Sequence, residues 1–269
     1  MSIKCKCLWF MSGILLISGL VFAEEKVNPQ HTLQNSYPIP IIFEVEKLKG
    51  EEKSFAELTD QAVSIIDARL KALGVKAKLR KEGDKRIIID LKEIINPERR
   101  ILNIIEKPYY LEFKLVENNP TLLEKALSGS VPENYQLLYE WEKDPKGVLK
   151  PSTPYLVFAQ PVLTGGDIQD AQQSYNSQSS LPVVDIKFNS AGTKKFAEVT
   201  EINTRKRLAI ILDGILQSAP LIMERIPSGR AQISGRLTDQ EASDLALALR
   251  TGSLPVRLKL VSKEMLNVR

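Results

Sequence analysis

The segment from Arg207 to Pro220 constrains the fold more than any other part of this sequence. It consists of an apolar run, an Asp-Gly pair at positions 213 and 214, and a second apolar stretch that ends at a proline. Asp-Gly supplies the positive φ angles that a two-residue hairpin turn requires, and proline is typical of the end of a strand. We therefore predict an antiparallel β-hairpin with its turn at Asp213 and Gly214.

The composition is that of a globular protein without a nucleic-acid partner. The 269 residues are 43% hydrophobic and carry a net charge of +4, so a core can form and the charge favours no polyanion strongly. The basic run from Arg205 to Arg207 has no interleaved aromatic residues, and we interpret it as a solvated helix end. Both cysteines, Cys5 and Cys7, lie near the N-terminus, so we expect neither a disulfide nor thiol chemistry in the mature chain.

The N-terminus has the pattern of an export signal. Lys4 and Lys6 precede an apolar stretch from Leu8 to Phe22, and Ala23 stands at a small-residue cleavage position. We predict a signal peptide over residues 1–23, followed by a flexible polar lead over 24–37. An uncleaved anchor over residues 4–23 is the alternative, and membrane contact is expected only in that case, since the apolar run is short for a membrane span.

Residues 38–117 carry strand and helix signals in the order β-α-β-β-α-β, the pattern of the split ferredoxin-like fold. The first helix has the clearest limits, because Ser54 and Glu57 have the spacing of a capping box and Gly74 is suited to its end. The expected elements are a strand over 39–47, a helix from 55, strands over 75–80 and 86–91, a helix that starts at Pro97 with Asn96 as its cap, and a fourth strand over 109–116.

A second domain is expected over residues 158–262, after a connector over 118–157 and before a tail over 263–269. Thr238 and Glu241 form a second capping box, and Gly252 ends the helix that follows. The sequence from Thr164 to Asp167 is expected to lead into a short helix. The other expected elements are a strand over 183–188, a helix over 191–203, the hairpin, a strand over 231–234 and a last strand over 256–261. The fold class is therefore α+β.

The sequence does not indicate catalysis. Its only histidine, His31, lies in the polar lead, which excludes a histidine-based triad and a metal site with several histidines. We expect no catalytic residue, no cofactor, no metal and no small-molecule substrate, so the chain is not expected to be an enzyme. An enzyme with an unrecognised site is the third and weakest alternative.

Two sets of residues are candidates for binding or movement. An apolar groove for an extended polypeptide is predicted from five residues, with burial in the core as the alternative interpretation: Ile215, Leu216, Leu221, Ile222 and Met223. Four turn or hinge candidates are Gly165, Gly166, Asp213 and Gly214. The Thr164–Asp167 turn could bind an anion, but a helix start is the simpler interpretation.

The sequence resembles the first periplasmic domain of SecD, a family of bacterial protein-export membrane proteins. The resemblance covers about residues 40–117 and 158–262, which correspond to the base and the head of that domain. Its strongest motifs follow in order: LTGGDIQDA at 163–171, PVVDIKFNSAG at 182–192, the hairpin, AQISG at 231–235 and EASDLALALRTGSLP at 241–255. Weaker similarity covers 66–75, 83–91 and 111–116. The Asp-Leu-x-Gly-Gly motif and the membrane helices usual in SecD are not found.

The resemblance implies a ferredoxin-like base followed by a SecD-like α+β head, which move as rigid bodies about junctions near residues 117 and 158. It implies a periplasmic accessory module of Sec-dependent export with no proton-driven motor of its own. The expected partners are Sec translocon subunits, exported unfolded polypeptides, or both. The alternative is an envelope interaction domain that reuses the fold for one fixed partner.

Overall fold

A computed structural model describes residues 40–48, 51–91, 98–143, 146, 148–235 and 237–261. The predicted signal peptide over 1–23, the lead over 24–37 and the tail over 263–269 lie outside the described residues. So do Cys5, Cys7, His31, and the predicted helix cap at Asn96 with Pro97.

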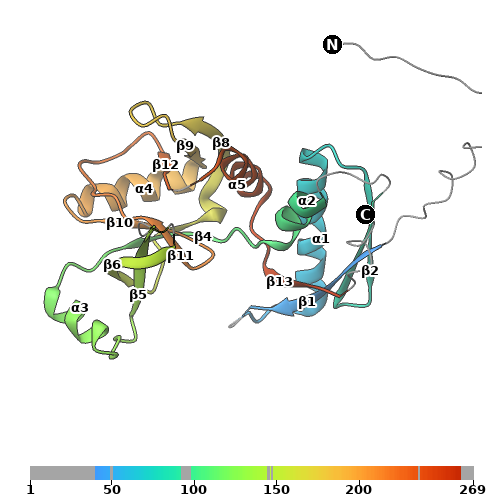
Figure 1. Ribbon diagram of the computed structural model, residues 1–269, viewed down its shortest axis with the longest axis horizontal. Helices are drawn as coiled ribbons and strands as arrows, with labels where there is room; N and C mark the ends of the chain where they lie inside the picture. Colours follow the sequence, from blue (N-terminus) through green and yellow to red (C-terminus); the bar gives the residue numbers. More distant parts are fainter. Residues whose placement is uncertain are drawn as a thin grey trace, which may run out of the picture. The chain divides into compact units, whose positions relative to one another are not determined.

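The base is a four-stranded antiparallel sheet in the order β13–β1–β3–β2, with two helices (Figure 1). This is the strand order of the ferredoxin-like fold, with β13 in the place of the fourth strand. The elements are β1 (Ile41–Lys47), α1 (Phe55–Ala72), β2 (Ala77–Glu82), β3 (Arg86–Leu91), α2 (Glu98–Glu106) and β13 (Val256–Leu260).

Local sequence explains the limits of α1. The Ser54 hydroxyl accepts the Glu57 N–H at 3.3 Å, and the Glu57 carboxylate accepts the Ser54 N–H at 3.0 Å, so the predicted capping box is confirmed. Gly74 follows the helix with a φ of +71°, which a residue with a side chain adopts at a cost. The buried face of α1 packs on the sheet through Leu58, Ala62, Ile66 and Leu70.

The predicted fourth strand of the base was wrong. β4 (Leu111–Leu115) pairs with β10 and β7 in another sheet, and β13 completes the base instead. The burial patterns give the reason. In β4, Leu111, Phe113 and Lys114 are all buried, as in a central strand covered on both faces, whereas β13 alternates buried apolar and exposed charged residues.

This pairing changes the domain organisation. The head is inserted between α2 and β13 and does not follow a complete base, so the boundary at residue 117 and the assignment of 256–261 to the second domain were wrong. The α+β class and the ferredoxin-like order of the base are confirmed.

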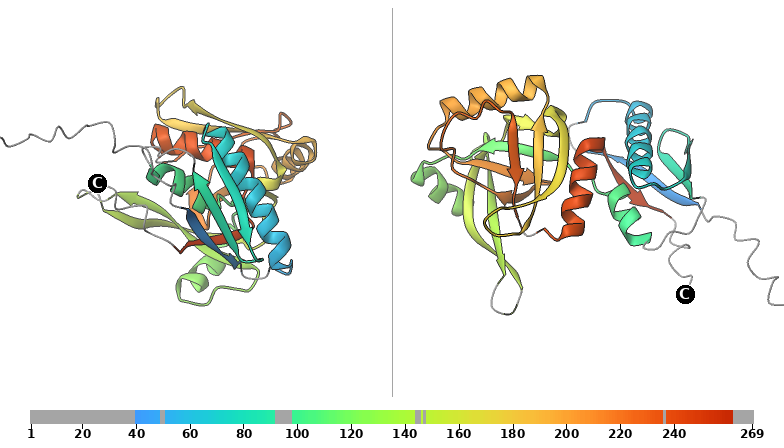
Figure 2. Two further views of the ribbon diagram at one scale, coloured as in Figure 1. Left: turned by 90° about the vertical axis from the view of Figure 1, so that its right-hand side faces the viewer. Right: turned by 90° about the horizontal axis from the view of Figure 1, so that it is seen from above.

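The head contains three sheets, in the orders β11–β10–β4–β7, β12–β9–β8 and β5–β6 (Figure 2). Its remaining strands are β5 (Tyr135–Lys143), β6 (Leu149–Phe158), β7 (Leu163–Thr164), β8 (Ile168–Tyr175), β9 (Pro182–Phe188), β10 (Leu208–Leu212), β11 (Ile215–Ser218) and β12 (Arg230–Ile233). Its helices are α3 (Pro120–Leu127), the 3-10 turn η1 (Gly165–Asp167), α4 (Ser190–Ile202) and α5 (Asp239–Thr251). The β10–β11 hairpin and the Thr238 capping box are confirmed.

The segment over 118–157 is part of the head and not a connector. It forms α3 and most of the β5–β6 hairpin, which joins the head through a bridge between Val116 and Val157. Leu138 and Val157 pack in one cluster with Ala209 and Ile211 of β10. Hinges near 117 and 158 are therefore excluded in this structure, because these positions pair with each other inside the head.

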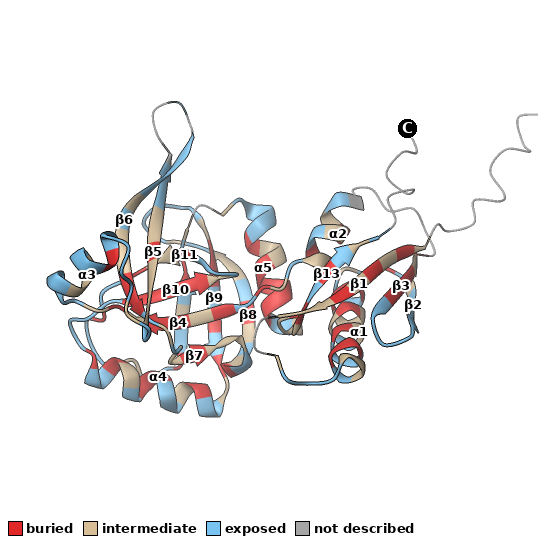
Figure 3. Ribbon diagram, turned by 90° about the horizontal axis from the view of Figure 1, so that it is seen from below, coloured by how far each residue is buried: buried red, intermediate tan, exposed pale blue. Residues whose placement is uncertain are grey.

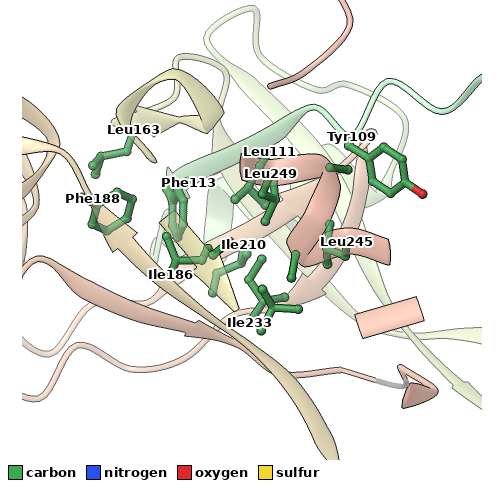
Figure 4. Packing of buried hydrophobic residues seen from close by; sticks show 14 of the residues in the cluster. Tyr109, Leu111, Phe113, Leu163, Ile186, Phe188, Ile210, Ile233, Leu245 and Leu249 are labelled. Atoms are coloured by element: carbon green, nitrogen blue, oxygen red, sulfur yellow. The ribbon is translucent and has the colours of Figure 1, made fainter. Parts of the chain in front are cut away.

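The main core of the head lies between its larger sheets and α5 (Figure 4). Phe113 of β4 meets the ring of Phe188 of β9 edge-on at 5.5 Å, and Phe196 of α4 packs on Phe188 at 5.0 Å. Leu245 and Leu249 of α5 belong to the same cluster, with 2% and 4% of their surface exposed. β11 and the β5–β6 hairpin lie at the border of this core.

The assignment of β13 to the base predicts where a destabilising mutation acts. Val256→Ala removes a fully buried side chain from the base core and should lower the free energy of unfolding by about 2 kcal/mol. Hydrogen exchange should show the loss of protection in α1. The exposed neighbour Arg257 provides the control, since Arg257→Ala should change stability by less than about 0.5 kcal/mol. Loss of protection confined to the head would contradict the pairing.

Candidate functional site

The five apolar candidates do not form one groove. Leu216 and Ile222 are each 5% exposed and belong to separate hydrophobic clusters of the head, so these two are core residues. Ile215, Leu221 and Met223 are exposed by 55%, 44% and 74%. Ile215 is the first residue of β11, directly after the hairpin turn. Leu221 and Met223 lie in the segment that follows β11.

Ile215 borders an open hollow of about 500 Å³ between β11 and the β5–β6 hairpin. The apolar part of its lining is Trp141, Leu149, Ile215 and Leu216, the polar part is Glu140, Glu142 and Gln217, and Gly235 completes the lining. Trp141 and Leu149 are 43% and 52% exposed. Figure 3 shows the hairpin extending away from the buried centre of the head. Large apolar side chains held in the open around a concave surface are typical of a binding site.

A β-bulge lies in the hairpin beside this hollow. The register between β5 and β6 shifts between Tyr139 and Trp141, so that Trp141 faces Pro151 and Tyr139 faces Pro154. Two residues of β6 therefore stand opposite the single residue Glu140 of β5, and the extra residue of the bulge lies on β6. Residues 140, 141 and 142 of β5 all line the hollow.

The strands around the hollow have free edges. Within the described residues, β11 pairs only with β10 and β5 only with β6, although β5 and β11 are close neighbours. An unpaired edge presents backbone N–H and C=O groups that can accept an added strand. The site therefore combines main-chain hydrogen-bonding groups with an apolar surface.

The lining of the hollow offers binding groups and lacks a nucleophile–base pair. It contains two carboxylates, one amide and apolar side chains. In the part of the chain that the structure describes, no group of three or more His, Cys, Asp or Glu side chains could hold a metal ion.

Trp141 and Leu149 are not among the residues that the sequence predicts for a binding site. The available signal was the aromatic and apolar cluster Tyr135, Leu138, Tyr139 and Trp141, which is more than a connector needs.

The four turn candidates lie in turns of the head and do not line the hollow. Asp213 and Gly214 have φ angles of +51° and +80°, as the hairpin turn requires, and the Asp213 carboxylate accepts the Tyr110 N–H at 2.7 Å. Gly165 and Gly166 begin η1, where a Cβ on Gly165 would lie 3.0 Å from the Ser253 hydroxyl.

The Thr164–Asp167 turn is occupied by its own carboxylate. Asp167 accepts the Thr164 N–H at 3.0 Å and pairs with Lys195 at 3.1 Å. The donors and the cation that an anion would need already serve Asp167, which leaves none for an anion. The predicted short helix after this turn was wrong, because the 3-10 turn Gly165–Asp167 passes directly into strand β8 at Ile168.

The chain crosses between base and head at 107–110 and 252–255, and a buried arginine fastens both crossings. Arg69 of α1 is fully buried and donates to the carbonyls of Ile104 at 2.7 Å, Lys107 at 2.8 Å and Pro108 at 3.2 Å, which end α2. It also donates at 2.9 Å to the carbonyl of Gly252, which ends α5. One cation therefore meets the negative ends of a base helix and a head helix.

Burial shifts the pKa values of two side chains at this crossing, Arg69 and Tyr109. Desolvation lowers the pKa of Arg69 to about 10, so the guanidinium stays charged at neutral pH. Its carbon lies 5.1 Å from the ring centroid of Tyr109, and burial raises the pKa of Tyr109 to about 12. A second contact between base and head joins Arg100 of α2 to Asp244 of α5 at 2.9 Å.

Comparison with known proteins gives a consistent result. Residues 137–256 match the family model described as SecDF, P1 head subdomain. This range starts within β5, so it includes most of the β5–β6 hairpin, which lies where the sequence predicts a connector.

Two curated relatives illustrate the similarity. The protein translocase subunit SecD of Magnetococcus marinus is 42% identical over 219 residues, which cover 81% of this chain and 41% of the relative. The subunit SecDF of Thermus thermophilus is 38% identical over 258 residues, 93% of this chain and 34% of the relative. The chain thus spans about half or less of the length of such relatives.

Solved structures agree. A chain from a structure described as "Structure and function of a membrane component SecDF that enhances protein export" matches with a TM-score of 0.64 and 32% identity. The match covers 84% of this chain and 99% of that chain, so a unit of this extent has been solved by itself. SecDF in a "Super-membrane-facing form" also matches with a TM-score of 0.64, over 83% of this chain and 29% of that chain. In the described residues, no helix combines the length and hydropathy needed to cross a membrane.

The role assigned to Arg69 predicts a large effect on stability. Arg69→Met keeps most of the side-chain volume but removes four hydrogen bonds to buried or partly buried carbonyls, so urea denaturation should show a loss of about 3 kcal/mol or more. Arg100→Met removes a partly exposed ion pair and serves as the matched control, with an expected loss of about 1 kcal/mol. Equal losses for the two variants would contradict the role of Arg69.

Proposed function

Because the chain belongs to the SecD/SecDF family and corresponds to its first periplasmic domain, P1, we propose that it is a periplasmic accessory module of Sec-dependent protein export. In this proposal the module binds an extended segment of a translocating or unfolded polypeptide in the hollow beside β11. It acts by binding and not by catalysis.

One observation carries the proposal: exposed Trp141, Leu149 and Ile215 surround a hollow next to strand edges that no other described strand pairs with. An extended polypeptide adds to such an edge through its backbone, which is the same for every sequence. Its alternate side chains enter the hollow and contact the apolar surface. This mode selects unfolded chains over folded ones and is tolerant of sequence, as an export factor with many clients requires.

Weak binding is expected from this geometry. The hollow is open, its apolar side chains come from a few short elements, and the bound segment loses conformational entropy when it becomes a strand. A weak and reversible contact lets a moving chain pass, whereas a tight one would stop it. Movement of the head relative to the base, which the family resemblance implies, would then act on the bound segment through the crossings at 107–110 and 252–255.

Binding can be followed with Trp141, which is the only tryptophan in residues 38–269. An unfolded, reduced exported protein should shift its emission to shorter wavelength as the indole becomes buried. The variant Ile215→Ser keeps this tryptophan and should raise the dissociation constant at least about fivefold, because it removes an apolar wall of the hollow. Leu127→Ser, an exposed leucine of α3 outside the hollow, should leave the constant unchanged.

Crosslinking in cells separates the proposal from its alternative. A photo-crosslinking residue at position 215 of the full chain should capture many exported proteins together with Sec subunits, whereas the same residue at position 78 in the base should not. One dominant folded partner at position 215, with neither Sec subunits nor a spread of clients, would overturn the proposal and favour an interaction domain with a fixed partner.

A further inference from the structure

The two most exposed large apolar side chains that the structure describes lie outside the hollow. Ile202, at the end of α4, is 78% exposed, and Met223, in the segment after β11, is 74% exposed. Leu221 is 44% exposed on the same segment. The proposed polypeptide site uses none of these side chains.

Backbone hydrogen bonds hold the two segments side by side. The Arg205 N–H donates to the Ile222 carbonyl and the Ile222 N–H donates to the Lys206 carbonyl, both at 2.8 Å, and Arg207 bridges with Leu221. The Ile226 N–H donates to the Thr200 hydroxyl at 2.9 Å. Residues 221–226 therefore run antiparallel to 200–207, beside the C-terminal end of α4, which Figure 1 labels. We call the exposed Ile202, Leu221 and Met223 on these paired segments the α4 tip.

Positive charge surrounds the apolar side chains of the α4 tip. Arg205 and Lys206 are exposed between Ile202 and the paired segment. Arg225 forms an ion pair with Glu201 at 3.2 Å, which neutralises that carboxylate. Across residues 201–207 and 221–225 the cations Arg205, Lys206, Arg207 and Arg225 outnumber the carboxylates Glu201 and Glu224.

We propose that the α4 tip docks on the surface of a bilayer that contains anionic phospholipid. Apolar side chains enter the region between headgroups and acyl chains, while lysine and arginine beside them contact the phosphates. A protein partner would need a surface shaped to receive Ile202 and Met223, since interfaces pack as densely as cores. A bilayer accepts protruding side chains without such a matching shape, and this favours the bilayer as the occupant.

The α4 tip includes residues for which the sequence predicts other roles. The basic run at 205–207, predicted to be a solvated helix end, becomes the electrostatic part of the contact. Leu221 and Met223, predicted to bind polypeptide, become part of its apolar portion. Three apolar side chains and a few cations give only weak attachment, so the contact should be reversible and sensitive to salt.

The test uses residues 38–269, because the match to a solved SecDF chain covers 84% of this chain and 99% of that chain. Vesicles of phosphatidylcholine with phosphatidylglycerol should carry this protein through a flotation gradient, and high salt should release it. Vesicles of phosphatidylcholine alone should not carry it. Absence of binding to the anionic vesicles, or equal binding to both kinds, would overturn the proposal.

Variants separate the α4 tip from other surfaces. Ile202→Ser with Met223→Ser, and separately Arg205→Gly with Lys206→Glu, should each reduce partitioning on the order of tenfold. Glycine is chosen at position 205 because Arg205 has a φ of +68°. The hollow provides the control, so Trp141→Ser with Ile215→Ser should bind vesicles like the unmodified protein. Unchanged partitioning of both α4-tip variants would place the contact elsewhere and refute the assignment.

A spectroscopic measurement tests the orientation directly. Met223→Trp in a Trp141→Phe background should show a blue shift with anionic vesicles and quenching by brominated acyl chains. An unshifted emission while the protein floats with the vesicles would show that position 223 stays in water and would overturn the proposal. Unchanged urea midpoints of all variants confirm that folding is not the cause of a loss.

Discussion

The arrangement of the whole structure depends on one buried cation, Arg69. A charge taken out of water is costly unless other groups replace its hydration, and here the replacements are carbonyl oxygens at the ends of two helices. One helix, α2, belongs to the base, and the other, α5, belongs to the head. The same interaction therefore satisfies helix ends and fixes where the chain passes from one subdomain to the other.

The surroundings of Arg69 extend this constraint. Tyr109 places its ring over the guanidinium with a backbone φ of +55°, and its carbonyl accepts the Ser253 hydroxyl at 2.9 Å. The Leu254 N–H donates to the Pro108 carbonyl at 3.0 Å. This hydrogen bond joins the segment that leaves the base to the segment that returns to it. A change in the orientation of the head must act on these contacts and on the Arg100–Asp244 ion pair, because they join the two subdomains where the chain crosses between them.

Local signals predicted much of the fold, and long-range pairing accounts for most of the errors. Capping boxes at Ser54 and Thr238 and the turn at Asp213 depend on residues a few positions apart, so they were predicted correctly. The strand at 111–115 and the strand at 256–260 both have apolar residues at alternate positions, and periodicity cannot say which sheet each one joins. For the hollow beside β11, the sequence identified Ile215 but not Trp141, since the two residues lie far apart in the chain and come together only because β5 packs beside β11.

The insertion of the head has a consequence for the time course of folding. In the base, Phe43 of β1 pairs with Leu260 of β13. The first described strand therefore cannot complete its pairing until the last described strand is available. A chain that emerges from its N-terminus presents β1 and the apolar face of α1 before β13 exists to cover them. Contacts between such distant parts form slowly, because the loop between them must close first. The head, whose strands are closer in sequence, can fold during this interval and shorten the effective loop, so that base completion is the last step of assembly.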